Sequence, residues 1–117
     1  MASYNELMKA LDKKPFDHDL GALALRLARA SGATRIYLFG SHARSEATPD
    51  SDIDLGFVFP KGVDTFKSLL QAQRLIWPRD RSYDMVPLTE EDLREQKSPL
   101  AREVAREGIV LYREDEM

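Results

Sequence analysis

Two aspartates at alternate positions are the residues of this chain best suited to chemistry. Asp52 and Asp54 lie in the segment Ser51-Asp52-Ile53-Asp54-Leu55. Alternate side chains of a strand point to the same face, so the two carboxylates would lie side by side while Ile53 and Leu55 enter a core. Two close carboxylates repel each other unless a cation lies between them. Such oxygen ligands favour Mg²⁺, which binds one or two carboxylates together with substrate phosphates.

A glycine-serine turn upstream could hold those phosphates. The apolar run from Ile36 to Phe39 predicts a strand that ends at Gly40 and Ser41. Glycine lets the backbone approach a ligand closely, and the amides after Ser41 can present N–H groups to an anion. The second strand, which carries the aspartates, is expected to start near Ser51.

A third aspartate, Asp84, lies in the segment 82–87, which alternates in polarity and predicts another strand. If this strand lies beside Asp52 and Asp54, its carboxylate reaches the same site and can orient or deprotonate an attacking hydroxyl. The alternative for Asp84 is a surface acid paired with Arg79 or Arg81.

Arg44 has two interpretations that the sequence leaves open. It follows the Gly-Ser turn closely enough to contact phosphate. It is equally suited to pair with a neighbouring acid such as Glu46 or Asp50.

These motifs resemble the signature of the minimal nucleotidyltransferases in the DNA polymerase beta superfamily. The family pattern GSxAR…SDxDL is similar to Gly40-Ser41-His42-Ala43-Arg44, six residues, and Ser51-Asp52-Ile53-Asp54-Leu55. The resemblance implies the nucleotidyltransferase fold and an Mg-dependent enzyme that transfers AMP from ATP, with two Mg²⁺ ions. Metal pairs stabilise the entering and leaving oxygens of such an in-line displacement. It implies Gly40, Ser41 and Arg44 as nucleotide-binding residues, and Asp52, Asp54 and Asp84 as metal-binding and catalytic residues.

The resemblance also implies a partner. Small proteins similar to this one act as antitoxins of HEPN-domain ribonuclease toxins, so a hetero-oligomer and adenylylation of a toxin tyrosine are expected. Two alternatives stay open: neutralisation of the toxin by binding alone, and nucleotidyl transfer to a small molecule such as an aminoglycoside. Replacing Asp52 and Asp54 by alanine would separate catalysis from binding.

The composition fits a single domain spanning residues 1–117, with 43% hydrophobic and 32% charged residues. A formal charge of -3 argues against broad affinity for nucleic acid, which needs a basic surface. There are no cysteines, so disulfides and thiolate metal sites are excluded. We find no signal peptide and no apolar run near the ~20 residues of a membrane span, and we expect a cytoplasmic protein.

The expected fold is α/β or α+β: a small, mixed, twisted sheet of three or four strands with helices packed mainly on one side. Apolar spacing predicts helices from Tyr4 to Leu11, from Asp17 or Asp19 to Ala30, and from Asp64 or Thr65 to about Ile76. Further helices begin at Thr89 and at Ser98-Pro99, the latter stops at Gly108, and Ile109 to Tyr112 is a closing strand.

Overall fold

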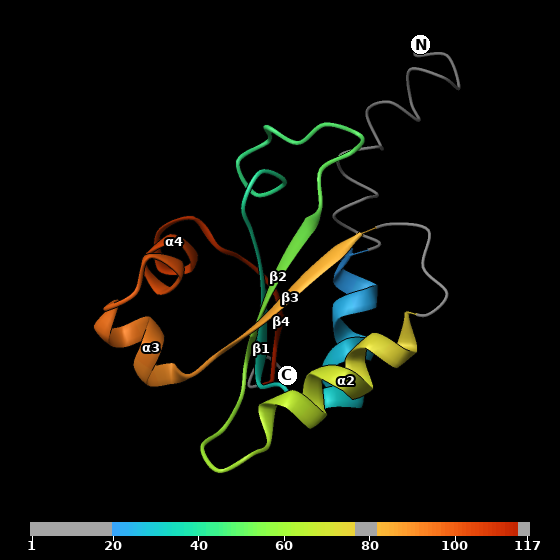
Figure 1. Cartoon of the computed structure of the whole chain (residues 1–117), viewed down its shortest axis with the longest axis vertical. Coiled ribbons are helices and arrows are strands. Elements are labelled where there is room, and N and C mark those ends of the chain that lie inside the picture. Colours follow the sequence, from blue (N-terminus) through green and yellow to red (C-terminus); the bar gives the residue numbers. More distant parts are fainter. Residues whose placement is uncertain (1–19, 77–81, 115–117) are drawn as a thin grey trace.

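The fold is built on one mixed sheet, seen in a computed structural model that describes residues 20–76 and 82–114 (Figure 1). Within these residues the strands are β1 (Arg35–Phe39), β2 (Ile53–Val58), β3 (Tyr83–Leu88) and β4 (Ile109–Arg113), in the order β3-β2-β1-β4. β1 pairs antiparallel with β2 and with β4, whereas β2 and β3 run parallel. The predicted mixed sheet is confirmed, with β2 beginning at Ile53 instead of near Ser51.

A helix lies within the connection between the two parallel strands. Parallel neighbours need a long crossover, because the chain must return to the same end of the sheet. α2 (Thr65–Leu75) lies between β2 and β3 in the chain. The Asp64 carboxylate caps it by accepting from the Lys67 N–H at 3.1 Å, which confirms the predicted start.

One face of the sheet packs against α2 and the helical residues 20–31. Strand alternation sends Ile36 and Leu38 of β1 and Ile53 and Leu55 of β2 to this face, and all four are essentially inaccessible to solvent. Burying an aliphatic side chain of this size contributes about 1.5–3 kcal/mol. This cluster therefore fixes β1 and β2, the two strands that flank the Gly-Ser turn.

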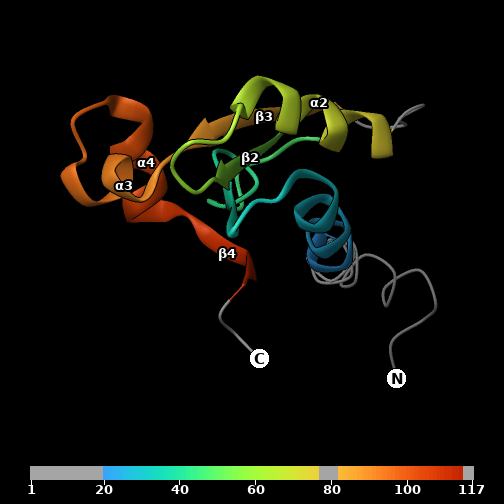
Figure 2. The same ribbon diagram turned by 90° about the horizontal axis from the view of Figure 1, so that it is seen from below.

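The opposite face also carries helices, which corrects the expectation of helices mainly on one side. Phe39, Val58 and Leu88 form a second buried cluster with Val104 of α4 (Pro99–Glu107). Figure 2 shows α4 and the adjoining α3 (Glu90–Glu95) on one side of the strands, with α2 and the helical residues 20–31 on the other. The apolar spacing of a short helix predicts its buried face but not the face of the sheet that it covers.

The starts of α3 and α4 are fixed by their capping residues, as predicted. The Thr89 hydroxyl accepts from the Asp92 N–H at 3.0 Å, and the Asp92 carboxylate accepts from the Thr89 N–H at 2.9 Å. Ser98 caps α4 by accepting from the Ala101 N–H at 3.0 Å, with Pro99 at the first helical position.

Some expectations concern other parts of the chain. The helix predicted from Tyr4 to Leu11, the helix start at Asp17 or Asp19, and the arginines at 79 and 81 lie outside the described residues. Among the described helices, none has the length and apolar character needed to cross a membrane.

Candidate active site

The register of the parallel strands brings two of the predicted acids together. Asp54 of β2 and Asp84 of β3 are direct partners across the β2–β3 pair. Paired residues of neighbouring strands point to the same face, so both carboxylates lie on the α4 side of the sheet. The prediction that the Asp84 strand lies beside the strand of Asp54 is confirmed, whereas Asp52 lies just before β2 and not in the strand as expected. Its alternative partners, Arg79 and Arg81, lie outside the described residues.

Asp54 lies at the centre of the acidic cluster. Its side chain is partly buried, and this burial raises the pKa of the carboxyl group. The negative charges of Asp84, Asp52 and Glu103 raise that pKa further, and His42 opposes them. Asp52 and Asp84 therefore both disfavour the ionised form of Asp54. A cation would relieve their repulsion.

The Gly-Ser turn meets this cluster directly. Gly40 follows β1, whose last residue, Phe39, pairs with Asp54. Gly40 has a positive φ of 76°, and a β-carbon at this position would overlap the Oδ2 atom of Asp54. Glycine suits this conformation, and a residue with a β-carbon would displace the Asp54 carboxylate or the turn. The two halves of the motif therefore touch through the Gly40 backbone and the Asp54 carboxylate.

A second turn fixes the entry to β2. The Thr48 N–H donates to the Ser51 hydroxyl at 2.9 Å, and the Ser51 N–H donates to the Thr48 carbonyl at 3.0 Å. The His42 ring lies 3.3 Å from the Ser51 carbonyl oxygen. Ser51 thus closes the turn immediately before Asp52, and this turn sets the direction in which Asp52 leaves the loop.

Arg44 is engaged by acids on two segments. Its Nε donates to Glu46 at 2.9 Å, while its Nη1 donates to Glu103 at 3.3 Å and to Glu107 at 3.2 Å. The hydrogen bonds to Glu46 and Glu107 raise the pKa of the guanidinium group. Glu46 was one of the partners predicted. Glu103 and Glu107 were not, since nothing in the local sequence relates α4 to the Gly-Ser turn.

The donor set suits Mg²⁺ in the presence of a phosphate ligand. Among residues 20–76 and 82–114, no three His, Asp or Glu side chains are grouped as a ready metal site. Mg²⁺ commonly takes one or two protein carboxylates and completes its shell with water and phosphate oxygens. Asp52 and Asp54 fit that requirement, and the roles assigned to these residues stay predictions.

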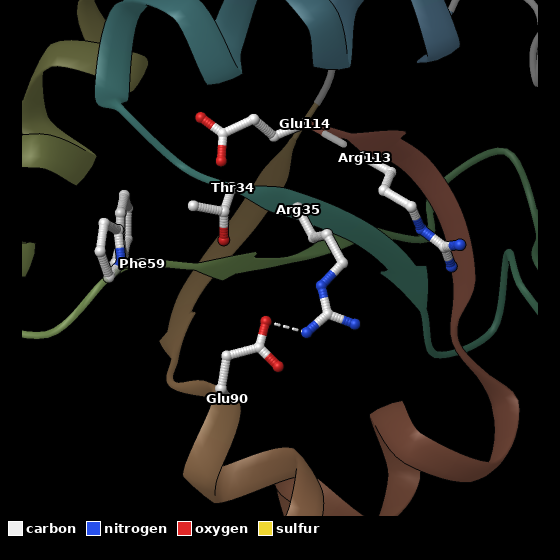
Figure 3. A pocket seen from close by; sticks show the side chains of 7 residues that line it. Thr34, Arg35, Phe59, Glu90, Arg113 and Glu114 are labelled. Atoms are coloured by element: carbon white, nitrogen blue, oxygen red, sulfur yellow. Dashed lines mark hydrogen bonds and ion pairs between the residues drawn. The ribbon is translucent and has the colours of Figure 1, made fainter. Parts of the chain in front are cut away.

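A cavity of about 620 Å³ lies away from Asp52, Asp54 and Asp84, at the other end of β1 (Figure 3). Arg35 at the start of β1 pairs across the sheet with Arg113 of β4, and its guanidinium points to Glu90 of α3, with which it forms an ion pair. The lining residues are Thr34, Arg35, Phe59, Pro60, Glu90, Arg113 and Glu114. None of the predicted site residues lines this cavity, and sequence patterns did not indicate it.

A mixed sheet in which a Gly-Ser turn contacts an Asp-x-Asp segment is typical of the nucleotidyltransferase class. Residues 26–117 match the family described as polymerase beta, nucleotidyltransferase, and the chain belongs to this family of enzymes. No curated protein gives a significant match.

Solved structures have the same fold. One chain of a toxin–antitoxin complex with AMP-PNP is 26% identical, with a TM-score of 0.61 over 82% of this chain and 75% of that one. A candidate nucleotidyltransferase from Sulfolobus solfataricus is 21% identical, with a TM-score of 0.62 over 92% and 89%. A chain from the complex of tri-AMPylated Shewanella oneidensis HEPN toxin with MNT antitoxin is 23% identical, with a TM-score of 0.55 over 83% and 72%.

Proposed function

We propose that this chain is an antitoxin that transfers AMP from ATP to a tyrosine hydroxyl of a HEPN-domain ribonuclease toxin. The observation that carries the proposal is the meeting of Gly40, Asp54 and Asp84 on adjacent strands of a polymerase beta nucleotidyltransferase domain. Support for the nucleotide comes from the similar toxin–antitoxin chain, whose complex contains AMP-PNP, an ATP analogue with nitrogen in place of the β–γ bridging oxygen. Because the reaction consumes ATP, the proposal places the protein in the cytoplasm.

The residues divide between holding the nucleotide and activating the acceptor. Gly40 and Ser41 would bind the β and γ phosphates through the turn that follows β1. Asp52 and Asp54 would hold Mg²⁺, with Asp84 helping to place a second ion. When bound, these ions supply charge neutralisation for the triphosphate. The proposal assigns no phosphate contact to Arg44, which is held by acids.

The reaction itself needs little covalent participation by the protein. The acceptor oxygen forms a bond to the α phosphorus, the bond from that phosphorus to the bridging oxygen breaks, and pyrophosphate leaves. The proton of the acceptor hydroxyl passes to the Asp84 carboxylate, which is exposed and can receive a substrate. Catalysis is then mostly a matter of positioning and of charge neutralisation.

The test is the intact mass of the cognate HEPN protein after incubation with this chain, ATP and Mg²⁺. We expect a gain in units of AMP that is lost with Asp54→Asn and with Asp52→Asn. Asp50→Asn is the matched control, because it removes the same charge from an exposed turn residue next to the motif. This control should transfer AMP at the wild-type rate.

Other outcomes would identify another function. No mass gain, with a stable complex that both Asp→Asn variants still form, would replace the proposal with neutralisation by binding alone. Transfer to a small molecule in the absence of any protein acceptor would replace it with a small-molecule nucleotidyltransferase.

A further inference from the structure

The contact between Arg44 and α4 joins two elements that are distant in the sequence. Glu103 and Glu107 are four residues apart, so they lie on the same face of α4. Both accept hydrogen bonds from the same nitrogen of Arg44, Nη1, at 3.3 and 3.2 Å. The Nε of Arg44 is occupied by Glu46 at 2.9 Å. A planar guanidinium can satisfy three acids in this way, whereas a lysine ammonium lacks the fixed donor geometry.

Arg44 is part of the turn that holds Gly40 and Ser41. The Arg44 N–H donates to the Gly40 carbonyl at 3.1 Å, and the Glu46 N–H donates to the Ser41 carbonyl at 2.9 Å. A restraint on the Arg44 side chain therefore also restrains the backbone that faces Asp54.

α4 is itself packed against the sheet, so it can hold the Arg44 side chain in place. Val104, which follows Glu103, is buried against Phe39 and Val58 of the sheet. The Gly108 N–H closes the helix by donating to the Val104 carbonyl at 2.9 Å. Because α4 is anchored to the same strand that leads into Gly40, its glutamates stand in a fixed position relative to the turn.

We propose that Glu103 and Glu107 are positioning residues for the nucleotide-binding turn: they hold Arg44 so that it fixes Gly40 and Ser41 against Asp54. This inference rests on the proposed function. In this role Arg44 restrains the turn and does not bind the triphosphate.

The decisive variant is Glu103→Gln/Glu107→Gln, compared with Glu91→Gln/Glu95→Gln on α3 as a control with the same change in charge. The readout is the dissociation constant of AMP-PNP with Mg²⁺, measured by calorimetry. Removing two negative charges should by itself strengthen the binding of an anion. Loss of positioning predicts the opposite sign, a weakening of about 5-fold, which corresponds to the usual strength of exposed ion pairs.

Tighter binding in Glu103→Gln/Glu107→Gln than in the α3 control would overturn the inference, because it would mean that the glutamates compete with phosphate for Arg44. Equal affinity in the two variants would overturn it as well.

A second readout does not depend on the reaction or on the nucleotide. Amide hydrogen exchange of residues 40–46 in the nucleotide-free protein should accelerate by about 5-fold in Glu103→Gln/Glu107→Gln, since each exposed ion pair stabilises modestly. Unchanged exchange would overturn the inference. If exchange accelerates but no AMP is transferred by the wild type, the positioning role stands and the proposed function fails.

Discussion

The backbone of Gly40 lies directly against the carboxylate of Asp54, with no room for a side chain between them. This contact arises because Phe39 and Asp54 are partners in the antiparallel β1–β2 pair, so the residue after β1 reaches the start of β2. A phosphate held at Gly40 would therefore be next to an acid suited to Mg²⁺. The proposed reaction therefore depends on this contact between the Gly-Ser turn and Asp54.

Gly40→Ala should strongly slow nucleotidyl transfer. The new methyl group would overlap Asp54 Oδ2 and lie 3.0 Å from its Cγ, so either the turn or the carboxylate must move. We expect the rate to fall at least 100-fold, since small misplacements in an active site cost about that factor. The measurement is AMP incorporation into the acceptor protein under saturating MgATP.

Gly62→Ala is the matched control for that substitution. Gly62 has a similar φ of 88°, but a β-carbon there meets nothing within 4 Å. Both variants carry the backbone cost of a left-handed residue, about 1–2 kcal/mol. Equal activity losses in Gly40→Ala and Gly62→Ala would show that backbone strain, and not the contact with Asp54, is responsible.

The raised pKa of Asp54 predicts a pH-dependent stability. The folded protein holds the proton of this carboxyl more tightly than the unfolded chain does. The stability that this group contributes is thus present below the ordinary aspartate pKa of about 3.9, and it is lost as the pH rises through the raised value. Ionised Asp54 therefore destabilises the metal-free protein at neutral pH.

Asp54→Asn should consequently raise the Tm at pH 7 in the presence of a chelator. The difference in Tm between the variant and the wild type should shrink towards zero near pH 3, where the wild-type carboxyl is also neutral. Calorimetry at the two pH values measures this difference. A Tm difference that is the same at both would rule out the charge of Asp54 as its origin.

Mg²⁺ and nucleotide should stabilise the protein together more than either does alone. Within the described part of the chain no three-ligand metal site is preformed, so Mg²⁺ needs phosphate oxygens to complete its shell. At 100 times its Kd, a ligand adds about 2.7 kcal/mol to stability. The expected result is an increase in Tm of more than about 5 °C with Mg²⁺ and AMP-PNP, and a much smaller one with Mg²⁺ alone.

Asp52→Asn/Asp54→Asn tests whether this stabilisation passes through the acidic cluster. It should remove the joint effect of Mg²⁺ and AMP-PNP on Tm. A wild-type shift with Mg²⁺ and AMP-PNP in the double variant would place the metal elsewhere.

Local sequence rules predicted the parts of the site that depend on neighbouring residues. Strand alternation predicted that Ile53 is buried and Asp54 is not, and the capping residues predicted where α2 and α4 begin. The position of Asp84 followed from a strand whose neighbour could be inferred only with the family resemblance in hand. These features are set by backbone geometry within one or two elements.

Contacts between distant elements could not be predicted in the same way. Arg44 and Glu107 are separated by 63 residues, and their meeting depends on α4 covering the same face as Asp54. The ion pair between Arg35 and Glu90, 55 residues apart, has the same origin. Side-chain pairs of this kind can be identified only from the three-dimensional arrangement, because arginine and glutamate are common on any protein surface and give no local signal of their partners.

Ser45→Gly should stabilise the protein without loss of transfer. Ser45 follows Arg44 in the turn and has a positive φ of 60°, which a residue with a β-carbon adopts at a cost of about 1–2 kcal/mol. Glycine removes that cost but adds about 0.5–1 kcal/mol of chain entropy to the unfolded state. The expected net gain is thus about 0.5–1 kcal/mol in the free energy of unfolding, measured with urea.

Gln96→Gly, at the left-handed C-cap of α3, is the control remote from the site and should gain a similar amount. A destabilised Ser45→Gly beside a stabilised Gln96→Gly would show that the Ser45 side chain itself holds the turn.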